Sequence, residues 1–247
     1  MQQDPANDEA LAALALSRAS AGSGEQSLQL LNDALKQRPK SAALHRAVGE
    51  VNIRLNRLPD AEAAFRRALE LSSPKGDVAG YLYAAGGLAD TLLAQGKVDE
   101  AAKVVDQLGK DAPNSGFALL MKGRVAAAQR NYPVALENLQ QLLNADPDNV
   151  QVRTLVGGVN LEQGNLEQAA MNLQRALAAS PDFVPARRLL AQVQMAQGRP
   201  EAASQTLEAS SSSEGQGSPD LLLMQARAAL AAGDQARAAR LLEQLEA

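Results

Sequence analysis

A glycine returns at a nearly fixed interval along this chain of 247 residues. In five places it stands five residues before a small residue, and these glycines are Gly22, Gly96, Gly164, Gly198 and Gly233. Aligning the five places divides the chain into repeats of 34 residues, which begin at Asp8, Ala42, Leu82, Gly116, Val150, Val184 and Pro219. A period of this length indicates small modules that stack on one another and share one continuous core.

The composition predicts that these modules are helical. Hydrophobic residues make up 46% of the chain, yet aromatic residues make up only 2% and tryptophan is absent, so alanine and leucine must fill the interior. Alanine, leucine, glutamine, glutamate and arginine are strong helix formers, and no segment shows the alternating β-branched pattern of a strand. We therefore expect an all-α protein with closely packed helices.

Small residues mark where the two helices of a repeat are expected to approach each other. Position 8 is always glycine or alanine, for example Gly49 and Gly157, and position 20 is alanine in most repeats. Glycine at position 15 can adopt a positive φ and reverse the chain, whereas Asn56 and Arg130 take its place in repeats two and four and make weaker matches. Prolines that end the second helices stand at Pro39, Pro113, Pro147 and Pro181.

A large apolar residue at position 24 is expected to be buried in every repeat. These residues are Leu31, Phe65, Val105, Leu139, Leu173, Leu207 and Leu242. Two segments break the register. Six extra residues at 76–81 precede repeat three, where Asp77 is expected to cap a lengthened helix, and a serine- and glycine-rich segment at 209–218 predicts a flexible loop before a hinged last repeat.

The order of these residues carries a family resemblance. In the segments 60–74, 132–147 and 166–181 a small residue is followed by a large apolar residue and then by a proline at similar spacings. This pattern resembles the tetratricopeptide repeat, a helix-turn-helix unit of 34 residues. The resemblance implies a right-handed α-solenoid of about seven units, near 8–41, 42–75, 82–115, 116–149, 150–183, 184–218 and 219–247.

The same resemblance implies a binding surface. In tetratricopeptide arrays the first helices line a concave groove, and their positions 2, 5, 9 and 12 usually meet a protein or peptide ligand. At such positions this chain clusters aromatic and charged residues in repeats three and four, and further charged or polar residues lie in repeats two and six. The candidate partner-binding residues are Tyr83, Asp90, Phe117, Arg124, Arg46, Glu50, Arg188 and Gln192. Gly86 and Gly87 are expected to open a shallow pocket between the aromatic residues. The alternative is that Asp90 and Arg124 are simply solvated, and that Tyr81 and Tyr132 pack between helices.

Several functions are disfavoured by what the chain lacks. Its net charge is −4 and it has no run of lysine or arginine, which argues against nucleic acid as a partner. No cysteine is present and none of the familiar catalytic motifs occurs, so we expect neither an enzyme nor a cofactor or metal site. The single histidine, His45, is interpreted as a packing residue, and pairs such as Glu62 with Arg66 are interpreted as solvated helix surface. No stretch is apolar and long enough to span a membrane.

A finer resemblance concerns the pathway. The segments 117–143 and 183–203 are similar to the bacterial tetratricopeptide proteins of exosortase, PEP-CTERM and exopolysaccharide systems. That similarity implies a scaffold in the cell envelope, in the periplasm if the chain is a fragment of an exported protein, because its start lacks the features of a secretory signal. A cytoplasmic adaptor or regulator is the alternative. The last repeat has no further helix to cover it, which predicts either a longer array or end-to-end self-association there.

Overall fold

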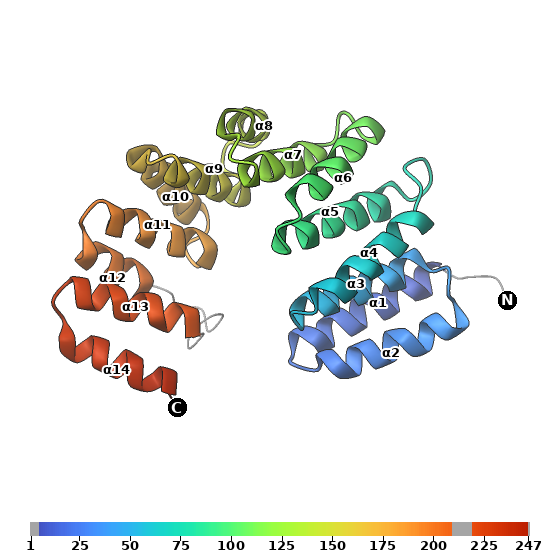
Figure 1. Cartoon of the computed structure of the whole chain (residues 1–247), viewed down its shortest axis with the longest axis horizontal. Helices are drawn as coiled ribbons and strands as arrows, with labels where there is room; N and C mark the ends of the chain where they lie inside the picture. Colours follow the sequence, from blue (N-terminus) through green and yellow to red (C-terminus); the bar gives the residue numbers. More distant parts are fainter. Residues whose placement is uncertain (1–4, 209–218, 247) are drawn as a thin grey trace. The chain divides into compact units, whose positions relative to one another are not determined.

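The computed structural model describes residues 5–208 and 219–246. Within these ranges it contains fourteen α-helices and no strand, as the sequence predicted (Figure 1). The helices are α1 (Pro5–Ser20), α2 (Gly24–Gln37), α3 (Ala42–Arg54), α4 (Leu58–Leu71), α5 (Val78–Ala94), α6 (Val98–Asp111), α7 (Gly116–Ala128), α8 (Tyr132–Ala145), α9 (Val150–Glu162), α10 (Leu166–Ala179), α11 (Val184–Ala196), α12 (Pro200–Glu208), α13 (Pro219–Ala231) and α14 (Gln235–Glu246). They alternate as the first and second helices of seven repeats.

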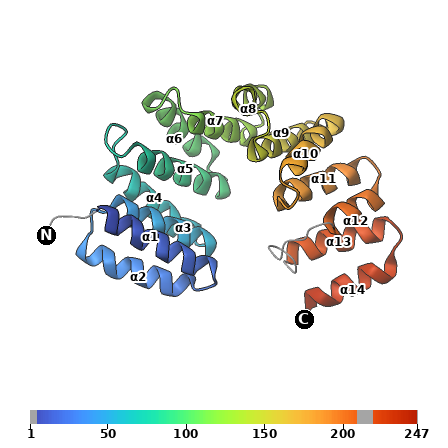
Figure 2. The same cartoon turned by 180° about the vertical axis from the view of Figure 1, so that it is seen from behind.

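The chain divides into two compact parts, which we call the N-terminal half (Met1–Asn131) and the C-terminal half (Tyr132–Ala247). In the N-terminal half the first helices α1, α3, α5 and α7 pack against one another in chain order. In the C-terminal half α9 packs against α11 in the same way, and each helix from α10 to α14 packs against the one before it (Figure 2). Helix stacking inside each half is therefore that of an α-solenoid.

All seven turns within the repeats have the same backbone conformation. The five glycines at position 15 have φ between +71° and +88°, in the left-handed region that glycine enters without strain. Asn56 and Arg130 occupy the same position with φ of +57° and +58°. The left-handed turn therefore forms even in the two repeats that lack the glycine, closed by 2.8 Å hydrogen bonds from the N–H of Arg57 to the carbonyl of Asn52 and from the N–H of Asn131 to the carbonyl of Ala126.

Close helix contact explains the small residues, as expected. A Cβ atom on Gly49 would lie 2.7 Å from Cε2 of Phe65, and one on Gly157 would lie 2.6 Å from Cγ of Leu173. The alanines at position 20 are fully buried, among them Ala61 and Ala169. The large residue at position 24 can thus press directly on the backbone of the first helix.

The residues at position 24 are buried as predicted in six of the seven repeats, with at most 1% of their surface exposed. Leu242 is the exception, because 40% of its surface is exposed, and the prediction that it is a buried knob is wrong. Among the described helices α14 packs only against α13, so no neighbouring repeat covers its outer side.

The structure describes the first of the two irregular segments. Asp77 caps α5 as predicted, since its Oδ1 accepts a hydrogen bond of 2.9 Å from the backbone N–H of Gly80. Residues 78–81 form the first turn of α5, which is the lengthened helix that the sequence predicts. The expected prolines stand two residues beyond the ends of α2, α6, α8 and α10. The predicted serine- and glycine-rich loop at 209–218 lies outside the described residues.

The sequence predicts that Glu62 and Arg66 form only a solvated pair on one helix, but the structure gives both of them contacts to the next repeat. Glu62 also accepts hydrogen bonds from Lys97 at 2.7 Å and from Gln95 at 2.9 Å, and both donors belong to the next repeat. Arg66 reaches Glu100 of that repeat at 2.7 Å. The hydrogen bonds from Lys97, Arg66 and Gln95 lower the pKa of Glu62 to about 2, so this carboxylate joins repeats two and three.

Candidate partner-binding surfaces

A continuous row of side chains crosses the first helices of the N-terminal half. On α3, Arg46 donates to both carboxylate oxygens of Glu9 on α1, at 3.0 and 2.8 Å. Its guanidinium carbon lies 5.8 Å from the centre of the Tyr83 ring on α5. Tyr83 in turn meets the ring of Phe117 on α7 edge to face, with the ring centres 6.1 Å apart. Four consecutive repeats thus each contribute one residue to the row.

Tyr83 is the most exposed large hydrophobic side chain among the described residues, at 61%. Only 14% of the Arg46 side chain is exposed, because it is held between a carboxylate and an aromatic ring. The cation–π contact and the aromatic pair fix the orientation of the Tyr83 ring while leaving much of it open. The result is an exposed aromatic group with little freedom left to lose.

A second group lies two helical turns further along the same helices, about 10 Å away. Arg124 on α7 donates to Oδ2 of Asp90 on α5 at 2.9 Å. Oδ1 of Asp90 is buried and has no hydrogen-bond partner among the described residues. Burial raises the pKa of Asp90, and it likewise raises that of Glu50, which lies 4.0 Å from Arg46. Asp90 and Arg124 are therefore paired with each other, and only about a third of each side chain is exposed.

The expectation that Gly86 and Gly87 open a pocket is wrong. A Cβ atom on Gly86 would lie 2.4 Å from Cζ of Phe117, and one on Gly87 would lie 2.3 Å from Cε1 of Phe65. The two glycines admit aromatic rings rather than a ligand. Tyr81 is buried as well, and its hydroxyl donates to Asp111, as the packing interpretation held. Burial raises the pKa of Tyr81 to about 12, together with the bond to Asp111.

A cavity lies on the first-helix side of the C-terminal half, between α11 and α13. Its volume is about 550 Å³, and the predicted residues Arg188 and Gln192 line it. Met195, Leu223, Met224 and Arg227 are the other large residues of the two first helices at the cavity, and Leu207 of α12 contributes as well. Asp220 lies 3.7 Å from Arg188. The cavity therefore combines a flexible apolar lining with two guanidinium groups.

The eight predicted residues thus fall into two groups. Six of them lie on α3, α5 and α7, where contacts link Arg46, Glu50, Tyr83 and Phe117 in one row and Asp90 with Arg124 in a separate pair. Arg188 and Gln192 belong to the cavity of the C-terminal half. Sequence reasoning gave most weight to repeats three and four and did not single out Met195 and Met224. The signal for the cavity was a methionine at groove position 12 of repeat six, Met195, and another beside groove position 5 of repeat seven, Met224.

His45 is half-buried, and its Nε2 lies 3.0 Å from the carbonyl oxygen of Pro39. In the described parts of the chain, no three acidic or histidine side chains gather as metal ligands would. No described helix is long and apolar enough to cross a bilayer.

Helix pairs of 34 residues, closed by a left-handed turn and packed through small residues, define a helical-repeat scaffold. Sequence profiles of the tetratricopeptide repeat match this chain, one at residues 52–122 and 160–226 and another at residues 8–75 and 120–182. The chain belongs to the tetratricopeptide-repeat family, whose members generally act as scaffolds for protein–protein interaction and are typically not enzymes. The comparison with curated proteins gave no match.

Solved structures share the fold at low sequence identity. A tetratricopeptide repeat protein from Parabacteroides merdae is 17% identical, with a TM-score of 0.67 over 97% of this chain and 92% of that protein. The APC/C hetero-tetramer Cut9–Hcn1 contains a chain 17% identical, with a TM-score of 0.68 over 94% of this chain and 44% of that one. A monomeric mutant of IFIT1 with Gppp-AAAA is 15% identical, with a TM-score of 0.73 over 91% of this chain and 55% of that one.

Proposed function

We propose that this protein is a non-enzymatic scaffold that holds a partner protein or peptide against the first helices of its repeats. The observation that carries the proposal is Tyr83, which is 61% exposed and yet oriented by Arg46 and Phe117. Aromatic residues and arginine supply much of the binding energy in protein interfaces. A ring that is already fixed loses little conformational entropy when a partner covers it.

The charge on this surface favours a protein over a nucleic acid. Arg46 is paired with Glu9, and Arg124 is paired with Asp90, so both arginines are already neutralised. A phosphate backbone is bound chiefly by free lysine and arginine side chains, and the net charge of the chain is −4. The structure of IFIT1 with Gppp-AAAA shows that the fold by itself does not decide this question. The pairing of the arginines is what supports a protein partner.

Photo-crosslinking in the native host tests the proposal. A photoreactive phenylalanine derivative is placed at Tyr83, and the matched control carries it at Val78, which is 48% exposed on the same helix α5. Successive helix residues are about 100° apart, so Val78 lies on a different side of α5 from Tyr83. We expect a discrete crosslinked protein from position 83 only. The same products from both positions, or none from position 83, would contradict the proposal.

Once the partner is known, affinity gives the second measurement. We expect Tyr83→Ala to weaken binding by roughly 30-fold, the effect of losing an interface anchor worth about 2 kcal/mol. The substitution truncates an exposed side chain, so the helical circular dichroism should be unchanged. Unchanged affinity with intact helicity would show that the ring is not an anchor.

For the pathway, we propose a scaffold in the bacterial cell envelope, in exopolysaccharide or surface-protein export. The support is the similarity of segments 117–143 and 183–203 to envelope tetratricopeptide proteins. A cytoplasmic adaptor is the second candidate. Fractionation of the native host with an antibody to this chain separates them, because protein found only in the cytoplasm would refute the envelope assignment.

We also propose end-to-end self-association through α14, because Leu242 occupies a position that is buried in the six other repeats. Sedimentation velocity over a range of protein concentrations tests this. Leu242→Glu should abolish any concentration-dependent increase in sedimentation coefficient. A wild-type protein that sediments identically at all concentrations would refute the proposal.

A further inference from the structure

Two clefts occur at equivalent repeat positions, away from positions 2, 5, 9 and 12. In the N-terminal half a cleft of about 480 Å³ lies among α2, α3 and α4, and positions 4, 7 and 11 of α3 line it with His45, Val48 and Asn52. In the C-terminal half a cleft of about 650 Å³ lies among α8, α9 and α10. Positions 4, 7 and 11 of α9 line this second cleft with Arg153, Val156 and Asn160. The equivalence permits a direct comparison of what stands at position 4.

Three repeats carry a nitrogen-bearing side chain at position 4, and two of these side chains bind the carbonyl of the preceding proline. Nε2 of His45 lies 3.0 Å from the carbonyl oxygen of Pro39. Arg187 of α11 donates to the carbonyl oxygens of Pro181 and Thr206. Arg153 has no hydrogen bond to a backbone carbonyl among the described residues. Its hydrogen-bond partner is the neutral side-chain oxygen of Asn172, at 3.1 Å from Nη1.

Arg153 is consequently a buried charge without a counter-charge. Only 6% of its surface is exposed, and Nε is buried without a hydrogen-bond partner in the described parts of the chain. No described carboxylate lies within ion-pair distance of its guanidinium, whereas Arg187 has Asp182 at 3.9 Å. Nε of Arg187 is also unpartnered, but its two Nη groups both hold carbonyls. Burying an unpaired guanidinium is costly, so the isolation of Arg153 inside a cleft indicates a missing anion.

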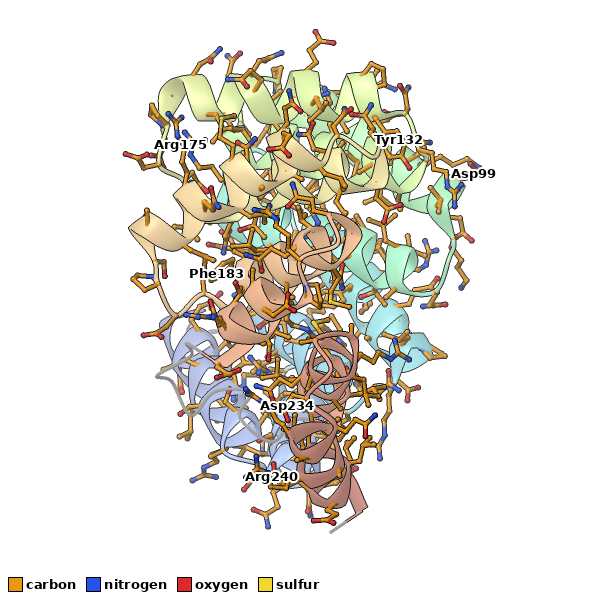
Figure 3. The ribbon with its side chains drawn as sticks, turned by 90° about the vertical axis from the view of Figure 1, so that its left-hand side faces the viewer. Asp99, Tyr132, Arg175, Phe183, Asp234 and Arg240 are labelled. Carbon is orange, nitrogen blue, oxygen red and sulfur yellow. The ribbon has the colours of Figure 1, made fainter. Side chains whose placement is uncertain are left out.

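The lining of the cleft specifies what kind of anion fits. Arg153 and Arg175 contribute two positive charges and Glu137 contributes one negative charge, which leaves the cleft one negative charge short. Arg175 of α10 lines the cleft, and Figure 3 shows it on the opposite side of the view from Tyr132, the first residue of α8. A monoanion neutralises this arrangement, whereas a phosphate dianion would overcompensate it. A carboxylate also matches the planar fork of a guanidinium.

We propose that the cleft among α8, α9 and α10 is a carboxylate-binding site that takes an aspartate or glutamate side chain of a partner protein. The carboxylate pairs with Arg153, and the aliphatic stem of the acidic residue lies against Leu136 and Met171, the latter 50% exposed. The assignment of the carboxylate to a partner protein rests on the proposed scaffold function. The site itself is built from repeat positions other than those of Tyr83 and its neighbours.

The Nε–H resonance of Arg153 in a ¹H–¹⁵N spectrum of the full chain is the direct probe, assigned by its loss in Arg153→Lys. The ligand is the capped pentapeptide Ala-Leu-Glu-Leu-Ala, and the control is the same peptide with glutamine at the centre. We expect a saturable shift with the glutamate peptide, no shift with the glutamine peptide, and an unmoved Arg187 signal. No shift with the glutamate peptide, or equal shifts with both peptides, would overturn the proposal.

Two further titrations decide the source of the anion. Inorganic phosphate that moves the Arg153 signal at the same concentration as the peptide would overturn the assignment to a carboxylate. Acetate that binds as tightly as the peptide would overturn the assignment to a partner segment, because the apolar contacts would then contribute nothing. Much weaker shifts with both small anions support the proposal.

Thermal unfolding distinguishes a ligand-binding arginine from a structural one. We expect Arg153→Met to keep or raise the melting temperature without ligand, because it removes an unpaired buried charge. Arg187→Met should lower it by several degrees, because it leaves two carbonyls without their donor. A loss in Arg153→Met as large as that in Arg187→Met would overturn the proposal. The Tyr83→Ala variant should titrate normally with the peptide, so a failure of the Tyr83 experiments and a failure here are separable.

Discussion

The contact between Gly49 and the ring of Phe65 gives a prediction whose sign depends on its surroundings. A Cβ atom at position 49 would lie 2.7 to 2.8 Å from three atoms of a ring that is 1% exposed and has no room to move. Overpacking of this kind costs about 1–3 kcal/mol. Replacing a helix-interior glycine by alanine returns about 1 kcal/mol of helix propensity. The difference of these two terms is a net destabilisation by Gly49→Ala of up to about 2 kcal/mol.

The sign should reverse when the ring is absent. Phe65→Ala alone is expected to cost about 3–5 kcal/mol, toward the upper end because Gly49 and Gly87 have no side chains that could fill the hole. In that background the new methyl group at position 49 meets empty space, so Gly49→Ala should stabilise by about 1 kcal/mol. The resulting coupling energy between the two positions is about 1–3 kcal/mol.

Urea unfolding followed by far-ultraviolet circular dichroism measures all four proteins of this cycle. The slope of the unfolding free energy against urea concentration must be equal among the four proteins, since repeat arrays can lose two-state behaviour. Gly158→Ala is the matched control, because a Cβ atom there would lie at an ordinary 3.6 Å from Leu189, and it should stabilise by about 1 kcal/mol. The reasoning is refuted if Gly49→Ala stabilises as Gly158→Ala does, or if its sign is the same in both backgrounds.

Three further outcomes are expected. Arg130→Gly should raise stability by about 1 kcal/mol in urea unfolding, because glycine relieves the left-handed strain at φ +58°, and Asn56→Gly should gain less because asparagine tolerates this region better. Glu62, with its pKa lowered to about 2, stabilises the protein above its ordinary pKa of 4.5 by about 1–2 kcal/mol after allowance for solvent screening. That stability is lost as the pH falls from 4.5 toward 2, so unfolding should be less acid-sensitive in Glu62→Gln than in the wild type. Spectrophotometric titration compared with Tyr81→Phe should show Tyr81 ionising at about pH 12, and Asp111→Asn should bring this ionisation to lower pH.

Much of the fold could be predicted because the repeat forces the same contacts to recur. Positions 8 and 20 accept only small side chains, and position 15 favours a residue that adopts positive φ without strain. The same residue types therefore recur there and can be recognised in the sequence. Arg130 shows the limit of this reasoning, since it adopts the left-handed conformation against its own preference. Leu242 shows another limit, because burial at position 24 requires a covering helix that periodicity does not supply.

The candidate site was less predictable because it depends on which side chains meet across repeats. Tyr83 and Phe117 share a repeat position, so their proximity followed from the alignment. The alignment did not predict that Phe117 fills the space above Gly86. A glycine in the sequence is equally consistent with an open pocket and with a neighbouring side chain packed against its backbone. The isolation of Arg153 was hidden for a similar reason. Arg187 occupies the same repeat position, and only the three-dimensional contacts show that the two guanidinium groups have different partners.

The ion pairs between consecutive repeats also bear on how such a chain changes over generations. Arg57 of repeat two reaches back to Glu25 of repeat one, and Lys97 of repeat three reaches back to Glu62 of repeat two. Repeat two therefore contributes a positively charged side chain to the ion pair with the repeat before it and a negatively charged side chain to the ion pair with the repeat after it. If recombination removed this repeat, Lys97 would face Glu25, again a base and an acid. An ancestor could thus have gained or lost a whole module here without leaving like charges opposed at the new junction.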